Sequence, residues 1–302
     1  MSYKHGLISR LKRAFTLAEV LITLTVIGVV AAMSIPNLIA NIDDSKFTGA
    51  RERAVYNIRE ATRSISSNNG GLNGLGTSIQ FRNVLATYLA TSKLCDTTTG
   101  CWHTANNSTK DASGNVLVTV PINGAGVGWG QVGNPGAAAG MILNNGTTMS
   151  VLYNTNCNEN TYVYSATNDR GENHVCANII FDTNGFAPPN KTGKDIGFAT
   201  VINPVNTVVA GIAPDTANLA DANWSTAQSN CSAKGDTWHL PTKDELNSLY
   251  FNKTITGLAD AGYWSSTEYS PFPTYAWGHY TGSGSQGSGG KGNAFRVRCV
   301  RR

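Results

Sequence analysis

The sequence predicts an α+β protein in which a long hydrophobic N-terminal helix packs on a β-rich domain and a small α+β module follows. No ionisable residue lies between Val20 and Met33, so this stretch is stable against lipid or other apolar helices and not in water. Short β-branched runs and frequent turn residues follow, including many of the 32 glycines. Beyond Pro204 and Pro214 a helical pattern with several tryptophans begins, which predicts a second module.

The composition indicates a loop-rich, mainly β chain. Its 302 residues are enough for two modest domains beside the terminal helix. The net charge is +4 and 14% of the residues are charged, so the sequence does not suggest a nucleic-acid-binding protein.

The N-terminal segment joins a basic stretch directly to the apolar run. Residues 4–13 are basic, and residues 13–20 read Arg-Ala-Phe-Thr-Leu-Ala-Glu-Val. Glu19 lies at the edge of the apolar run, where a carboxylate is costly to desolvate, so we expect it to have a partner. An ordinary secretory signal would instead place its cleavage site after the apolar run.

These residues resemble the prepilin signature of type IV pilins and type II secretion pseudopilins. The resemblance implies that a prepilin peptidase and methyltransferase cleaves between Ala14 and Phe15 and methylates the amino group of Phe15. Glu19 would be the fifth mature residue and would pair with the Phe15 amino group of a neighbouring subunit, which sets the filament register. Pro36 matches the proline that often kinks the family's helix. The family usually has glycine where Ala14 stands.

The predicted domain plan follows this resemblance. Residues 1–14 form the leader, residues 15–42 a transmembrane and filament-core helix, residues 43–210 an amphipathic helix half with a pilin-like globular domain, and residues 215–302 the last module. An apolar stripe continues the helix beyond Pro36 and ends near residues 66–71; it comprises Phe47, Ala50, Ala54, Ile58, Ala61 and Ile65. The precursor is then expected in the inner membrane, and the mature chain in a cell-surface filament or a periplasmic pseudopilus.

Several short elements are expected in the middle of the chain. The patterns predict a helix over residues 79–92, strands at residues 116–120 and 176–181, and a hairpin that turns at Asn145-Gly146. A further helix is expected over residues 217–234.

Asp182, Asn184 and Asp195 lie after a predicted buried strand and resemble a loop seen near the end of many pseudopilin-like domains. Oxygen ligands in such a loop can bind calcium. The alternative is that these side chains only form turns with the backbone and that the protein has no cofactor, which the low carboxylate count favours.

Six cysteines in an exported chain predict disulfides. They fall into three neighbourhoods, although the sequence alone allows many pairings. We expect the three bridges Cys95–Cys101, Cys157–Cys176 and Cys231–Cys299.

The last part of the chain resembles the C-type-lectin-like module of bacterial surface proteins and adhesins, which is related in fold to formylglycine-generating enzymes. The resemblance rests on residues 231–250, on Tyr-Trp-Ser-Ser-Thr-Glu-Tyr at 263–269, on Trp277 and on residues 295–302. Thr242 and Glu245 form a predicted capping box. Trp238, Trp264 and Trp277 are expected to anchor a small core.

The insert over residues 270–292 is the expected recognition surface. It contains Tyr275, His279 and Tyr280, which we expect to be exposed beside a stretch too glycine-rich to pack. The calcium-dependent sugar motifs of animal lectins are absent from this sequence. Because Cys231 and Cys299 look paired, no reactive thiolate is expected, and neither is an enzyme.

The sequence therefore predicts a minor pilin that displays a lectin-like module for attachment to a glycan or protein ligand. Its expected partners are the prepilin peptidase and other pilin subunits, but not nucleic acid. A type II secretion pseudopilin is the main alternative. An enzyme on the formylglycine-generating scaffold and a structural cap that binds nothing are the others.

Overall fold

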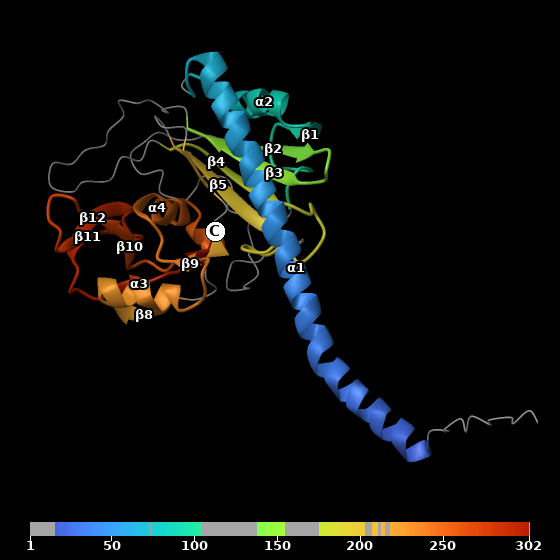
Figure 1. Ribbon diagram of the computed structural model, residues 1–302. Helices are drawn as coiled ribbons and strands as arrows, with labels where there is room; N and C mark the ends of the chain where they lie inside the picture. The colour runs from blue at the N-terminus through green and yellow to red at the C-terminus, as the bar shows by residue number, and fades with distance from the viewer. Residues whose placement is uncertain are drawn as a thin grey trace, which may run out of the picture. The chain divides into compact units, whose positions relative to one another are not determined.

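The computed structural model describes residues 16–72, 74–103, 138–154, 175–202, 207–210, 213–214 and 218–301 (Figure 1). The predicted leader, Phe15, the strand at residues 116–120 and Cys157 lie outside these ranges. The contacts divide the chain into two units, Met1–Lys46 and Phe47–Arg302. Each unit is described by itself below.

Helix α1 spans Leu17–Asn69 and includes Pro36. It ends where the sequence predicts, because Gly70 has φ 70° and the amide of Gly71 donates to the carbonyl of Ser66 at 2.8 Å. Across the described ranges, no helix is both long enough and apolar enough to cross a membrane.

The second half of α1 presents the predicted apolar stripe to the core. Ala54, Ile58, Ala61 and Ile65 are buried, and Val55 joins them. Arg51 is also buried, and its guanidinium donates to the carbonyls of Gly193 and Lys194. Its charge alone predicts that Arg51 is exposed. The two carbonyls that accept from it come close to Arg51 only when the chain is folded.

A six-stranded antiparallel sheet forms the centre of the second unit, with neighbouring strands following chain order. Its strands are β1 Thr91–Cys95, β2 Ala139–Leu143, β3 Thr148–Tyr153, β4 Val175–Asp182, β5 Ile196–Ile202 and β6 Thr207–Ala210. The predicted hairpin joins β2 to β3, and Gly146 adopts φ 87° in its turn.

Helix α2 spans Ser78–Tyr88 and is shorter than predicted. A capping box between Thr77 and Gln80 begins it. The sequence predicts helix up to Ser92, but β1 starts at Thr91 and pairs with β2. Pairing with a distant strand overrides the local helical pattern there.

Side chains of the sheet alternate between two faces, and both faces are covered. Met149, Val151 and Tyr153 belong to one cluster with the apolar stripe of α1 and with Phe81 of α2. On the opposite face, Leu152, Ile180 and Phe198 cluster with Leu246 and Leu249 from the C-terminal part. Residues on both sides of the predicted boundary at 210–215 therefore share a hydrophobic core.

The C-terminal part is built around a mixed sheet of order β12-β11-β10-β13-β8, and Figure 1 shows helices α3 and α4 on opposite sides of this sheet. The larger elements are β8 Leu219–Ala222, α3 Trp224–Ser232, α4 Lys243–Phe251, α5 Lys253–Thr256, β10 Gly262–Glu268, β11 Tyr275–Tyr280, β12 Ser285–Gly290 and β13 Phe295–Val297. Three two-residue strands form a small second sheet; they are β7 Ala213–Pro214, β9 Trp238–His239 and β14 Val300–Arg301.

Two sequence predictions for this part are wrong. A helix was predicted over residues 217–234, but the first part of this range forms strand β8. Helix α3 begins only after Asn223, whose side chain accepts from the amide of Thr226. The glycine-rich stretch expected to be too flexible to pack forms β12, which pairs with β11 along its whole length.

Phe295 explains how a strand of glycines can pack. A Cβ placed on Gly289 would lie 3.1 Å from the Phe295 ring, and a Cβ on Gly278 would also lie 3.1 Å from it. The ring stacks on Trp264 with centroids 4.4 Å apart. The glycines therefore leave room for two aromatic rings to lie directly on the sheet.

Candidate functional site

The N-terminal end of α1 carries the residues predicted for filament assembly. The Glu19 carboxylate accepts from both the amide and the hydroxyl of Thr16 at 2.9 Å, and the Thr16 hydroxyl accepts from the Glu19 amide at 3.3 Å. This is a capping box at the start of α1. Ala14 and Phe15 lie outside the described residues, so cleavage, methylation and the roles of Glu19 and Pro36 stay predictions.

Two of the three predicted disulfides are confirmed: Cys95–Cys101 and Cys231–Cys299. Cys176 is disulfide-bonded as well, while its predicted partner Cys157 lies outside the described residues. The Cys231–Cys299 bridge joins α3 to the last strands of the chain across 68 residues.

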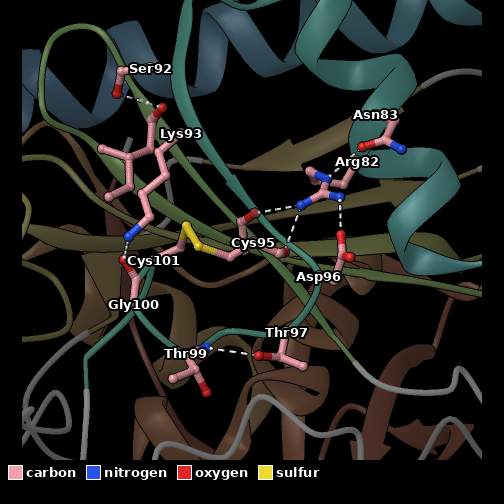
Figure 2. Close-up of a disulfide and its surroundings, with 12 residues drawn as sticks. Arg82, Asn83, Ser92, Lys93, Cys95, Asp96, Thr97, Thr99, Gly100 and Cys101 are labelled. Atoms are coloured by element: carbon pink, nitrogen blue, oxygen red, sulfur yellow. Dashed lines mark hydrogen bonds and ion pairs between the residues drawn. A yellow bond between two sulfur atoms is a disulfide. The ribbon is translucent and has the colours of Figure 1, made fainter.

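Figure 2 shows that Arg82 of α2 organises the loop closed by Cys95–Cys101. The buried guanidinium donates to the carbonyls of Cys95 at 2.6 Å and Gly140 at 3.1 Å, and to the Asp96 carboxylate at 2.9 Å. Because two of these acceptors are backbone carbonyls, Arg82 fixes the loop on the sheet more than it forms an ion pair with exposed Asp96.

The residues predicted as calcium ligands lie at the end of β4, which is Asp182, and in the loop that leads to β5, which contains Asn184 and Asp195. The Asp195 carboxylate accepts from the amides of Asn190, Lys191 and Ile196 at 2.7, 2.7 and 3.1 Å. Asp182 accepts from the amide of Asn184 at 3.1 Å. Both carboxylates therefore accept hydrogen bonds from backbone amides of the turns around them, as the alternative to a calcium site predicts. No group of three or more His, Cys, Asp or Glu side chains suited to a metal is found among the described residues.

Asp182 also forms a buried pair with His103. The imidazole Nε2 lies 2.9 Å from the carboxylate Oδ2, and both side chains are fully enclosed. Burial raises the pKa of Asp182 to about 6, and the His103 hydrogen bond opposes this shift.

The connection between β10 and β11 carries exposed aromatic side chains. We call residues 269–275 the aromatic loop. Phe272 is 59% exposed and Tyr275 is 41% exposed, which is unusual for large apolar side chains. The Tyr269 ring stacks on Phe272 at 6.1 Å and meets the edge of Trp277 at 5.1 Å. The ammonium of Lys243 lies 3.6 Å from the centre of the Trp277 ring.

Of the three predicted ligand-contact residues, Tyr275 and Tyr280 are exposed but His279 is not. The His279 side chain is buried and its ring lies 4.6 Å from that of Tyr250. Burial lowers the pKa of His279 to about 3, so the ring is neutral at physiological pH. The prediction fails because strand alternation places His279 on the face of β11 covered by α4, while its neighbour Tyr280 points to the opposite face and is exposed.

Comparison with known families identifies both ends of the chain. Residues 9–35 match the family model of the prokaryotic N-terminal methylation motif, the signal of type IV pilins and pseudopilins. Residues 202–301 match the Lcl C-terminal domain, a lectin-like adhesin module. These matches confirm the predicted resemblances. A comparison with curated proteins gives no match.

Sequence reasoning missed two features. Phe272 lies between Pro271 and Pro273, a local signal of a fixed, exposed turn that could have identified it. The buried hydrogen bonds between Asn178 of β4 and Asn252 at the end of α4 have no sequence signal, because asparagine is ordinarily a surface residue.

Proposed function

We propose that the chain is a minor type IV pilin-like subunit that carries its C-terminal module on the outside of a filament and uses it for surface attachment. The observation that supports this most is the layering of the second unit. The amphipathic half of α1 covers one face of the six-stranded sheet, and α4 of the module covers the other. If α1 faces the filament core, as the methylation signal implies, the module faces away from it.

The proposed activity is recognition and not catalysis. The module's cysteines, Cys231 and Cys299, are joined in a fully buried bridge. A bridged sulfur has no thiolate that could act as a nucleophile. We also propose that the Asp182 and Asp195 loop works without a bound ion, because backbone amides already occupy both carboxylates.

Mass spectrometry of sheared surface filaments tests the filament half of the proposal. A peptide that begins at N-methylated Phe15 is expected in the filament fraction. If that peptide occurs only in membranes, the chain is a secretion pseudopilin or another membrane-held subunit, and surface attachment is wrong. The Glu19→Ala variant is the matched control, because its precursor is expected in membranes and not in filaments.

The attachment half is tested with cells that lack the chain. Complementation with the wild-type chain is expected to restore binding to the surface these cells colonise. If the chain is present in filaments and attachment does not change, the attachment half of the proposal is wrong and the filament half stands.

A further inference from the structure

The aromatic loop of the C-terminal module is uncharged and exposed to solvent. It reads Tyr-Ser-Pro-Phe-Pro-Thr-Tyr, and residues 270–275 are all exposed. Phe272 at its centre is 59% exposed, and Tyr275 at its end is 41% exposed. Neighbouring apolar side chains left in water mark an interaction site more often than isolated ones do. We therefore asked what kind of partner the loop fits.

Most of the backbone polar groups of the loop are satisfied without water. Pro271 and Pro273 have no N–H group, and the carbonyl of Thr274 accepts from the amide of Lys291 at 2.9 Å. Three further amides donate to carbonyls inside the loop: Tyr269 N to Tyr275 O at 3.0 Å, Phe272 N to Tyr269 O at 2.9 Å, and Tyr275 N to Phe272 O at 2.8 Å. Such internal pairing is the condition for a loop to enter an apolar phase, where water cannot serve its backbone.

The rings of the loop are tilted against one another. The Tyr269 and Phe272 rings lie 6.1 Å apart with 27° between their planes, whereas Phe272 and Tyr275 lie 6.0 Å apart with 57° between theirs. A rigid flat ligand cannot lie on both Phe272 and Tyr275 at once. A fluid phase has no fixed shape and can surround tilted rings.

Cations lie beside the base of the loop and not within it. The ammonium of Lys243 lies 3.6 Å from the centre of the Trp277 ring, whose edge meets the Tyr269 ring at 5.1 Å. The ammonium of Lys291 lies 2.8 Å from the Glu268 carboxylate. Apolar rings in front of lysine side chains suit a membrane surface, because the rings can enter the interface while the ammonium groups stay at the level of the phosphates.

We infer that the aromatic loop is a membrane anchor, in which Phe272 enters the interface of a phospholipid bilayer while Tyr269 and Tyr275 lie at the level of its headgroups. Tyrosine favours this position because its ring is apolar and its hydroxyl stays in contact with polar groups. A protein partner would add hydrogen bonds and charge pairs around the buried rings. This loop instead pairs most of its backbone groups internally and has no charged side chain. The inference rests on the proposed attachment role of the module and adds the kind of partner.

The test measures whether the chain captures lipid vesicles. The full chain is held in phosphatidylcholine nanodiscs, which cover the apolar residues of α1, and the nanodiscs are fixed to a sensor surface. Protein-free phosphatidylcholine vesicles are passed over them, and saturable capture beyond that of empty nanodiscs is expected. Phe272→Ala is expected to weaken capture about tenfold or more, because it removes the most exposed ring of the loop. Phe272→Trp is expected to retain it.

Tyr56→Ala is the matched control, because Tyr56 is 58% exposed but lies on α1. It is expected to leave capture unchanged. The inference is overturned if phosphatidylcholine vesicles are not captured, if capture requires added phosphatidylglycerol, or if Phe272→Ala captures vesicles as the wild type does. It is also overturned if the chain captures only membranes of the colonised surface and loses them after protease treatment, since the partner is then a protein.

The outcome is separable from the tests of the proposed function. If the chain restores attachment of cells but captures no vesicles, the attachment role stands and only the membrane anchor is wrong. If the chain captures vesicles through Phe272 but does not restore attachment, the anchor stands and the attachment half of the proposed function is wrong.

Discussion

Asn178 of β4 and Asn252 at the end of α4 exchange hydrogen bonds between their buried side-chain amides. Asn178 Nδ2 donates to Asn252 Oδ1 at 2.9 Å, and Asn252 Nδ2 donates to Asn178 Oδ1 at 3.2 Å. The Thr200 hydroxyl donates to Asn178 Oδ1 and also lies 2.6 Å from the Ser248 hydroxyl. This network joins the central sheet to the C-terminal module, and its geometry allows few alternative dockings of the two.

A double-mutant cycle on this pair is the first prediction. Asn178→Ala takes away the donor to Asn252 Oδ1, and Asn252→Ala takes away the acceptor for Asn178 Nδ2. Each variant is therefore expected to lower the free energy of unfolding by about 1–3 kcal/mol. The free energy of unfolding of the double variant is expected to fall by less than the sum of the two single losses, because neither asparagine remains to lack its partner. Urea unfolding measures the cycle, and strictly additive losses would contradict the coupling.

Glu19→Ala is expected to prevent incorporation into filaments while membrane insertion is retained. Its carboxylate is needed to pair with the Phe15 amino group of a neighbour, and an unpaired carboxylate in an apolar surround is costly. Cell fractionation with immunoblotting measures this. Thr16→Ala is the control, since it removes the two hydroxyl contacts between Thr16 and Glu19 and leaves the carboxylate in place. Wild-type filament levels in Glu19→Ala would refute the pairing.

The two described disulfides are expected to stabilise the fold unequally. In the chain-entropy model, the Cys231–Cys299 bridge contributes about 4 kcal/mol and the much shorter Cys95–Cys101 loop about 2 kcal/mol. Paired serine variants of each bridge, compared by denaturant unfolding, test this order. Equal losses would show that loop length does not decide the effect here.

Acid is expected to destabilise the module through His279. Its pKa is about 3 in the folded chain and about 6.5 when unfolded, so the unfolded chain binds the extra proton as the pH falls below 6.5. This contribution is present above pH 6.5 and is lost toward pH 3. At pH 5 the loss is about 2 kcal/mol relative to neutral pH.

The control for this prediction is His279→Phe, which keeps an aromatic ring against Tyr250. The stability difference between wild type and this variant is expected to change by that amount between pH 7 and pH 5. Asp182 acts in the opposite direction, because its raised pKa favours the folded state on acidification, but its effect cancels in the difference. A difference that does not vary with pH would contradict the assignment.

Glycines under Phe295 are expected to be intolerant of a methyl group. A Cβ at Gly278 would lie 3.0 Å from the Tyr263 carbonyl oxygen and 3.1 Å from the Phe295 ring. Gly278→Ala is therefore expected to cost about 1–3 kcal/mol. Gly290→Ala is the matched control, since a Cβ there meets only the Asn293 amide at 3.8 Å. Thermal unfolding distinguishes the two, and equal melting temperatures would contradict the packing argument.

Local patterns in the sequence predicted the elements whose signals lie within a few residues. The stripe from Ala54 to Ile65, the turn at Asn145-Gly146 and the capping box of Thr242 and Glu245 are all present in the structure. The helix expected up to Ser92 and the loose glycine stretch at residues 285–290 were wrong, because pairing with distant strands decided both. The local preference of a segment carries no information about the distant strand with which it pairs.

The sequence alone was enough to recognise both ends of the protein. The N-terminal signal is recognised from the order of its basic, apolar and acidic residues, and the last part from its lectin-like pattern. Only the tertiary structure decided what a side chain faces. It buried Arg51, Arg82 and His279, exposed Phe272, and joined Asn178 to Asn252 across 74 residues. The physical reason is that burial and hydrogen-bond satisfaction depend on which distant segments meet, and a folded core leaves few ways for them to do so.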